Sequence, residues 1–251
     1  MSASAKDRIL ARIRAANRTA GHGLGSGPRG APGSGPGGPA AGGPAAGERA
    51  DRDADAAYAA LPRPYLRAHH DPATHDIAAL FAERVADYRA VVERVPGPGA
   101  LAAAVARVLA ERTAAVPGPV LVPAGLPAAW LAELPAAITL ARDEPPFPSA
   151  ELDRMAGVLT GCAVAVAETG TIILDHGPGQ GRRALTLVPD FHLVIVGEDQ
   201  VAADLADAFA RLDPARPRTL ISGPSATSDI ELIRVEGVHG PRTLHVLLAG
   251  P

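Results

Sequence analysis

Acidic and hydroxyl side chains stand beside glycines in three short stretches of the second half of the chain. The first reads ETGTIILDHG and begins at Glu168, the second reads SGPSATSDIE and begins at Ser222, and the third reads VHGP and holds His239. A carboxylate can act as a general base or a nucleophile, and histidine titrates more readily near neutral pH than any other side chain. These stretches therefore hold the candidate functional residues.

Glu168 follows five apolar residues and precedes Thr169-Gly170-Thr171, so we expect its carboxylate at the end of a strand. There it could act chemically, or it could only accept hydrogen bonds from the N–H groups of the turn. His239 allows the same two interpretations, a titrating group or a packed turn residue.

Ser222, Gly223 and Ser225 follow an apolar run, a pattern that predicts a strand, a glycine turn and a helix start. The free N–H groups of a helix start suit a small anion, although Asp229 would repel one, and simple helix capping explains the same residues. The stretch contains neither a P-loop nor the dinucleotide fingerprint GxGxxG.

Arg182 and Arg183 follow the loop GPGQG, which would let a guanidinium reach a carboxylate or phosphate with two hydrogen bonds. A solvated basic pair is the alternative. The predicted cleft for a small anionic ligand has the catalytic candidates Glu168, Asp229 and His239. Its ligand-binding candidates are Thr169, Gly170, Thr171, Arg182, Ser222, Gly223 and Ser225.

We predict no metal site, because His69, His70 and His75 have no acidic partner at helical spacing. Cys162, the only cysteine, lies in an apolar run and is expected to be a core residue. One cysteine excludes a disulfide within the chain and an iron–sulfur cluster held by this chain alone.

The elements that position these residues alternate between strands and helices. Nearly half of the residues are apolar (47%) but only 3% are aromatic, which suits alanine-rich helices on strands of valine and isoleucine. We predict a mainly parallel α/β sheet flanked by helices on both faces, with its ligand site at the carboxyl ends of the strands. The predicted helices cover residues 71–94, 101–111 and 200–212. The predicted strands cover residues 120–122, 137–140, 162–167, 171–174, 192–196, 218–222 and 243–249.

Three regions follow one another along the chain. Residues 1–18 are predicted to form an amphipathic helix, residues 19–57 a disordered linker rich in Gly, Pro and Ala, and residues 58–251 the α/β domain. The start lacks the features of a secretory signal and no apolar run is long enough to span a membrane, so we expect a cytoplasmic protein without membrane insertion. The net charge of −3 gives no sequence-wide attraction to nucleic acid.

Four blocks resemble, in order and spacing, the lactate-utilisation protein C family, whose core is called the LUD domain. They are AETGTIIL (167–174), RRALTLVPDFHLVIV (182–196), ISGPSATSDIE (221–231) and GVHGPRTLHVLL (237–248). The stretches KDRILARIRAA and FAERVADYRAVVERV are also similar to that family. The glycine- and proline-rich segment between them is interpreted as an insertion.

The resemblance implies a fold similar to that of sugar-phosphate isomerases, CoA transferases and 5-formyltetrahydrofolate cyclo-ligase, with an N-terminal helical extension. It implies a non-redox subunit that works with two iron–sulfur partner proteins to oxidise L-lactate to pyruvate, so that lactate can serve as a carbon source. In the transferases a glutamate close to a glycine carries the acyl group, and Glu168 resembles it. A stand-alone CoA transferase-like or cyclo-ligase-like enzyme using Glu168 is therefore the alternative, and an assembly factor with a vestigial cleft is a third.

Overall fold

The computed structural model describes residues 58–61, 70, 73–227, 235–236 and 240–251 of the chain. The chain divides into two units, Met1–Arg63 and Pro64–Pro251, and all strands and numbered helices given below belong to the second. The predicted N-terminal helix (1–18) and linker (19–57) lie outside the described residues.

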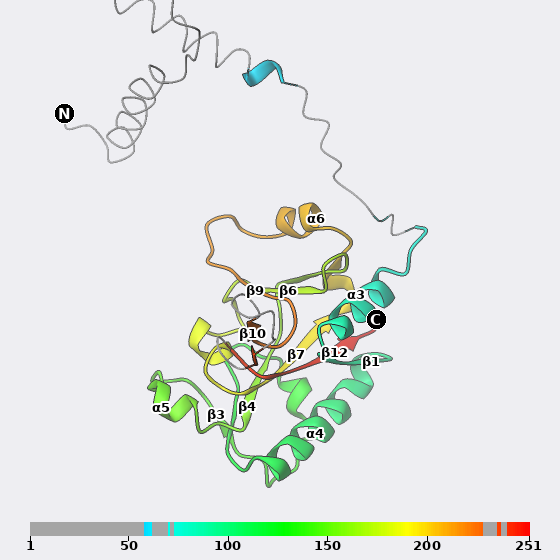
Figure 1. The fold of residues 1–251 in the computed structure, drawn as a ribbon. Coiled ribbons are helices and arrows are strands. Elements are labelled where there is room, and N and C mark those ends of the chain that lie inside the picture. The colour runs from blue at the N-terminus through cyan, green and yellow to red at the C-terminus, as the bar shows by residue number, and fades with distance from the viewer. Residues whose placement is uncertain (1–57, 62–69, 71–72, 228–234, 237–239) are drawn as a thin grey trace, which may run out of the picture. The chain divides into compact units, whose positions relative to one another are not determined.

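A six-stranded, all-parallel sheet forms the body of the second unit (Figure 1). Its strand order is β1-β12-β7-β4-β2-β3. The strands are β1 (Val91–Val95), β12 (Thr243–Ala249), β7 (Phe191–Gly197), β4 (Gly157–Thr160), β2 (Val120–Leu121) and β3 (Leu140–Ala141). The central strand β7 is buried from Phe191 to Val196, as expected for a parallel strand covered on both faces. The prediction of a mainly parallel α/β sheet is confirmed.

Alternate residues of β7 belong to two separate hydrophobic clusters, because side chains of a strand point to opposite faces of its sheet. Leu193 and Ile195 share a cluster with helix α4 (Pro98–Ala115). Val194 and Val196 share the other with helix α3 (Ile77–Asp87) and with a second sheet. In Figure 1, α4 lies on one side of the parallel sheet, and the second sheet lies on the other.

The second sheet has four strands in the order β8-β5-β6-β9. They are β8 (Val201–Ala202), β5 (Val164–Val166), β6 (Thr171–Leu174) and β9 (Thr219–Ile221). Strand β6 is antiparallel to both β5 and β9, while β8 is parallel to β5. The carboxyl ends of β8, β5 and β9 therefore meet the amino end of β6 at one edge. The predicted pair of strands around a tight bend at Thr169 and Gly170 is confirmed.

Helix α4 has 18 residues and α3 has 11, and the other described helices are shorter. They are α5 (Ser149–Leu152), α6 (Leu205–Ala210) and the 3-10 turns η1 (Ala128–Leu131), η2 (Arg183–Thr186) and η3 (Glu198–Gln200). Among the residues that the structure describes, no helix has the length and apolar character needed to cross a bilayer.

The predicted helix over residues 71–94 is wrong in its extent. Helix α3 begins after Asp76, whose side chain accepts a hydrogen bond of 2.9 Å from the N–H of Ala79, and ends at Asp87. Arg89 then adopts a positive φ of 66° and the chain turns into β1. The sequence VVERV of β1 favours a strand because its valines are β-branched, and β1 pairs with β12.

Two further predicted helices differ from the structure. The helix over residues 200–212 is wrong in its first half, because Val201 and Ala202 form β8 and the helix itself, α6, begins only at Leu205. The helix start expected after Ser225 is also wrong. Ala226–Thr227 (β10) instead pairs with Val235–Glu236 (β11) in an antiparallel ladder, so the turn at Ser222 joins two strands.

Candidate functional site

One edge of the four-stranded sheet gathers polar residues from distant parts of the chain. Glu168 follows β5, Ser222 follows β9, Asp204 follows β8, and Thr171 opens β6. The Oγ1 atom of Thr171 lies 2.8 Å from the Oγ1 atom of Thr169 and 2.8 Å from the Oγ atom of Ser222. Three hydroxyl groups in contact therefore connect the Glu168 turn with the Ser222 turn. The contact is possible because the ends of β5 and β9 lie beside the start of β6.

Gly170 fixes the shape of the Glu168 turn. Its φ is +57°, and a Cβ atom there would stand 2.7 Å from the backbone carbonyl carbon of Arg84. The N–H of Glu168 donates to the carbonyl of Ala203 at 3.1 Å, which ties the turn to the end of β8. The backbone at Glu168 is thus held in one place, and only glycine fits at the position two residues later.

Replacing Thr171 by Val is expected to destabilise the protein by about 1–3 kcal/mol, because the near-isosteric change removes both hydroxyl contacts of a side chain that is 5% exposed. Urea denaturation would measure the change. The matched control is Thr113→Val, whose hydroxyl bonds only carbonyls of its own helix and whose loss should cost less than about 0.5 kcal/mol. Equal effects of the two changes would contradict the prediction.

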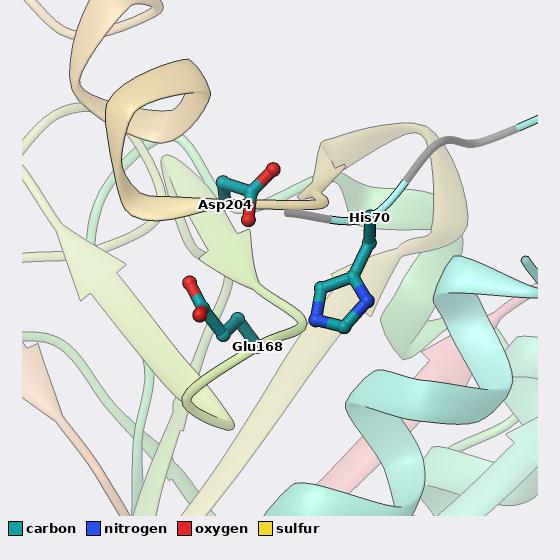
Figure 2. A group of neighbouring side chains, drawn as sticks. All are labelled: His70, Glu168 and Asp204. Atoms are coloured by element: carbon teal, nitrogen blue, oxygen red, sulfur yellow. The ribbon is translucent and has the colours of Figure 1, made fainter. Parts of the chain in front are cut away.

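Glu168 faces Asp204 and His70 across a shared space (Figure 2). One ligating atom of each residue lies within 4.8 Å of those of the other two. Asp204 is 2% exposed, while Glu168 and His70 are half-buried. Two carboxylates and an imidazole can exchange protons, and they are also the donor set that zinc accepts. Spacing along the chain does not reveal this group, because its acids lie far from His70 in sequence.

A separate cavity of about 220 Å³ is lined in part by the residues on either side of Ser222 in the chain. Gly223 and Ser225 form part of its wall, together with residues at the amino ends of β7 and β12. Gly223 has a φ of +84°, and a Cβ atom there would collide with the side chain of Tyr88. The turn therefore needs glycine to pass between α3 and the cavity.

His192 of β7 is the imidazole that lines this cavity. It is 1% exposed, its Nε2 atom lies 2.7 Å from the Oγ1 atom of Thr160, and its Nδ1 atom has no hydrogen-bond partner among the described residues. Burial, assisted by the charge of Arg183, lowers the pKa of His192 to about 3, so the ring is neutral at physiological pH. The sequence does not single it out, although a histidine inside the apolar run FHLVIVG is an available signal.

Arg182 belongs neither to the polar edge of the four-stranded sheet nor to the lining of the 220 Å³ cavity. Its Nε and Nη2 atoms donate to the carboxylate of Asp143 at 2.5 and 3.1 Å, and Nη2 also donates to the carbonyl of Phe147 at 2.8 Å. The hydrogen bond with Asp143 raises the pKa of Arg182. Its neighbour Arg183 lines the cavity beside His192 instead.

A third cavity, of about 800 Å³, lies at the carboxyl edge of the parallel sheet, where Gly197 ends β7 and Gly250 follows β12. Trp130 and Cys162 also line it. Burial raises the pKa of the Cys162 thiol to about 12, which removes it as a thiolate nucleophile near neutral pH. None of the predicted site residues that the structure describes lines this cavity.

The predicted site residues thus fall into four groups. Glu168, Thr169, Gly170, Thr171 and Ser222 share the edge of the four-stranded sheet, Gly223 and Ser225 line the adjoining cavity, Arg182 lies apart, and Asp229 and His239 lie outside the described residues.

The predicted site residues all lie within the part of the chain that matches one family model. Residues 149–249, from α5 to the end of β12, match the model of the LUD domain. The chain is 48% identical over 197 residues to "Lactate utilization protein C" of Deinococcus radiodurans, an alignment that covers 76% of this chain and 84% of that protein. A protein with the same name from Bacillus pumilus is 37% identical over 92 residues, which cover 33% of this chain and 38% of that protein.

The fold is also similar to a solved structure. The crystal structure of a DUF162 family protein from Deinococcus radiodurans, at 1.70 Å resolution, matches with a TM-score of 0.57 and 40% sequence identity. The match covers 74% of this chain and all of that chain.

Proposed function

Because this chain belongs to the lactate utilization protein C family, we propose that it is a non-redox subunit of a system that oxidises L-lactate to pyruvate. The observation that carries the proposal is the 48% identity to the Deinococcus protein over 84% of that protein's length. The family's role in lactate utilisation gives the substrate, and pyruvate is the two-electron oxidation product of lactate.

In this proposal two partner proteins carry the electrons on iron–sulfur clusters. Such clusters are held by several cysteine thiolates, and this chain has only Cys162. The system is proposed to work in the cytoplasm. The chain itself contributes binding and proton-accepting side chains, because oxidation of a 2-hydroxy acid releases protons as well as electrons, and Glu168, Asp204 and His70 form a group able to accept them.

Deletion of the gene is expected to abolish growth on L-lactate as sole carbon source and to leave growth on pyruvate unchanged, because pyruvate lies after the proposed step. Restoring the wild-type gene is expected to restore growth on lactate. Normal growth of the deletion strain on lactate would refute the proposal. Co-purification from lactate-grown cells tests the subunit assignment, and the proposal expects two partners, at least one with cysteine-rich cluster motifs.

The stand-alone enzyme using Glu168 is the alternative function. It expects the purified chain alone to turn over an acyl-CoA or a reduced folate, whereas the proposed subunit does not.

A further inference from the structure

We propose that the cavity beside the Ser222 turn binds a short 2-hydroxy or 2-oxo monocarboxylate, with Arg183 holding the carboxylate and His192 Nδ1 holding the oxygen at C2. The inference deepens the proposed function and rests on it for the choice of ligand class. The cavity and its hydrogen-bonding groups stand on geometry alone.

The size of the cavity selects a ligand of few atoms. Its volume of about 220 Å³ is below the range of about 300–1,000 Å³ typical of sites for drug-sized molecules. Ile221, Pro241 and Leu244 give it apolar walls, which suit a methyl or other short alkyl group.

The charge of the described part of the cavity lining favours an anion. Arg183 is the cation among the described lining residues, and those residues include no Asp or Glu. The Nη1 atom of Arg183 bonds the hydroxyl of Thr186 at 3.3 Å, and within the described part of the chain no carboxylate pairs with this guanidinium. The side chain is exposed at the rim of the cavity, where an entering carboxylate could accept two parallel hydrogen bonds from it.

His192 supplies the group that recognises oxygen at C2. A buried ring nitrogen without a partner is unfavourable. The Nδ1 atom has almost no accessible surface in this structure, so a ligand oxygen removes that penalty only when the cavity wall shifts to admit it. If the hydroxyl of Thr160 accepts a hydrogen bond from Nε2–H, then Nδ1 carries no proton and accepts a hydrogen bond from a 2-hydroxyl group. If Thr160 donates instead, then Nδ1 carries the proton and donates to a 2-oxo group. The same neutral ring therefore suits both members of a hydroxy acid and oxo acid pair.

Isothermal titration calorimetry of the purified full chain with L-lactate, pyruvate and propionate tests the inference. Propionate has the carboxylate and the alkyl group but no oxygen at C2, so we expect it to bind at least about tenfold more weakly than lactate or pyruvate. Arg183→Gln should weaken binding of all three acids by about 10- to 100-fold, because it removes the charge. Arg154→Gln, at an exposed arginine that does not line the cavity, is the matched control and should leave the affinities unchanged.

A change at His192 gives a second, different signature. In His192→Gln the side-chain amide can replace Nε2 toward Thr160 and leaves nothing in the place of Nδ1. This variant should lose affinity for lactate and pyruvate about tenfold and bind propionate as the wild type does. Should it fail to fold, ¹⁵N-histidine NMR of the wild type replaces it, and the Nδ1 resonance of His192 should shift when lactate or pyruvate is added.

Absence of saturable binding of both lactate and pyruvate would overturn the inference, and so would unchanged affinities in Arg183→Gln or an unmoved Nδ1 resonance. These failures are distinguishable from failure of the proposed function. A deletion strain that loses growth on lactate while the purified chain binds neither acid would refute only the cavity assignment, and binding with normal growth would refute only the role in lactate oxidation.

Discussion

Acidification is expected to destabilise this protein through one buried side chain, His192. Burial lowers its pKa to about 3, whereas a histidine in the unfolded chain titrates near 6.5. Between these values the unfolded chain binds more protons than the folded one, so the free energy of unfolding falls as the pH falls. The stabilisation from the neutral ring is fully present above about pH 6.5 and is lost toward pH 3, at up to about 1.4 kcal/mol per pH unit.

Urea denaturation at several pH values between 7 and 4 measures this loss. His192→Gln should show a pH dependence that is shallower than that of the wild type by up to about 1.4 kcal/mol per unit, while contributions from carboxylates cancel between the two proteins. His75→Gln, at an exposed histidine, should keep the wild-type slope. Parallel slopes of wild type and His192→Gln would show that the ring is not held neutral by burial.

The sequence pattern of apolar runs and turn residues predicts those elements whose tertiary contacts favour the same secondary structure. The apolar run of β7 reads as a buried parallel strand and is one, and the turn at Thr169 and Gly170 reads as a tight bend and is one. The stretch after Tyr88 fails because a helical pattern continues into VVERV, where pairing with β12 decides the outcome. The end of α3 and the start of β1 depend on pairing with a strand about 150 residues away in the sequence. Local hydrophobic periodicity carries no information about that partner.

Some residues of the candidate site are likewise predictable from local pattern, and others are not. Glu168 and Ser222 are predictable because each follows a strand, and parallel strand ends meet at one edge of a sheet. Asp204 is not, because residues 200–212 resemble one amphipathic helix and only the pairing of β8 with β5 brings its carboxylate to Glu168. Which of two adjacent arginines faces the cavity is decided by Asp143, which holds Arg182 from a distant loop.

In the proposed lactate-oxidising complex, replacing Glu168 by Gln is expected to lower the rate of lactate oxidation about 100-fold or more, without loss of the complex. Glu168, Asp204 and His70 bring three titratable groups within 4.8 Å, and Asp204 is almost fully buried. Two carboxylates and an imidazole at this distance can pass a proton among them. Loss of one general base typically costs a factor of about 10² to 10⁴ in rate.

Lactate-dependent reduction of a dye by the co-purified complex measures the Glu168 effect, with Glu151→Gln, at an exposed position on α5, as the matched control. The fall should appear in kcat, since the carboxylate acts after binding, whereas Arg183→Gln should act mainly on KM. Full activity of Glu168→Gln in an intact complex would favour the assembly-factor interpretation. Loss of the complex itself would give Glu168 a structural role, in which the carboxylate holds the turn between β5 and β6 that reaches Ser222 through Thr171.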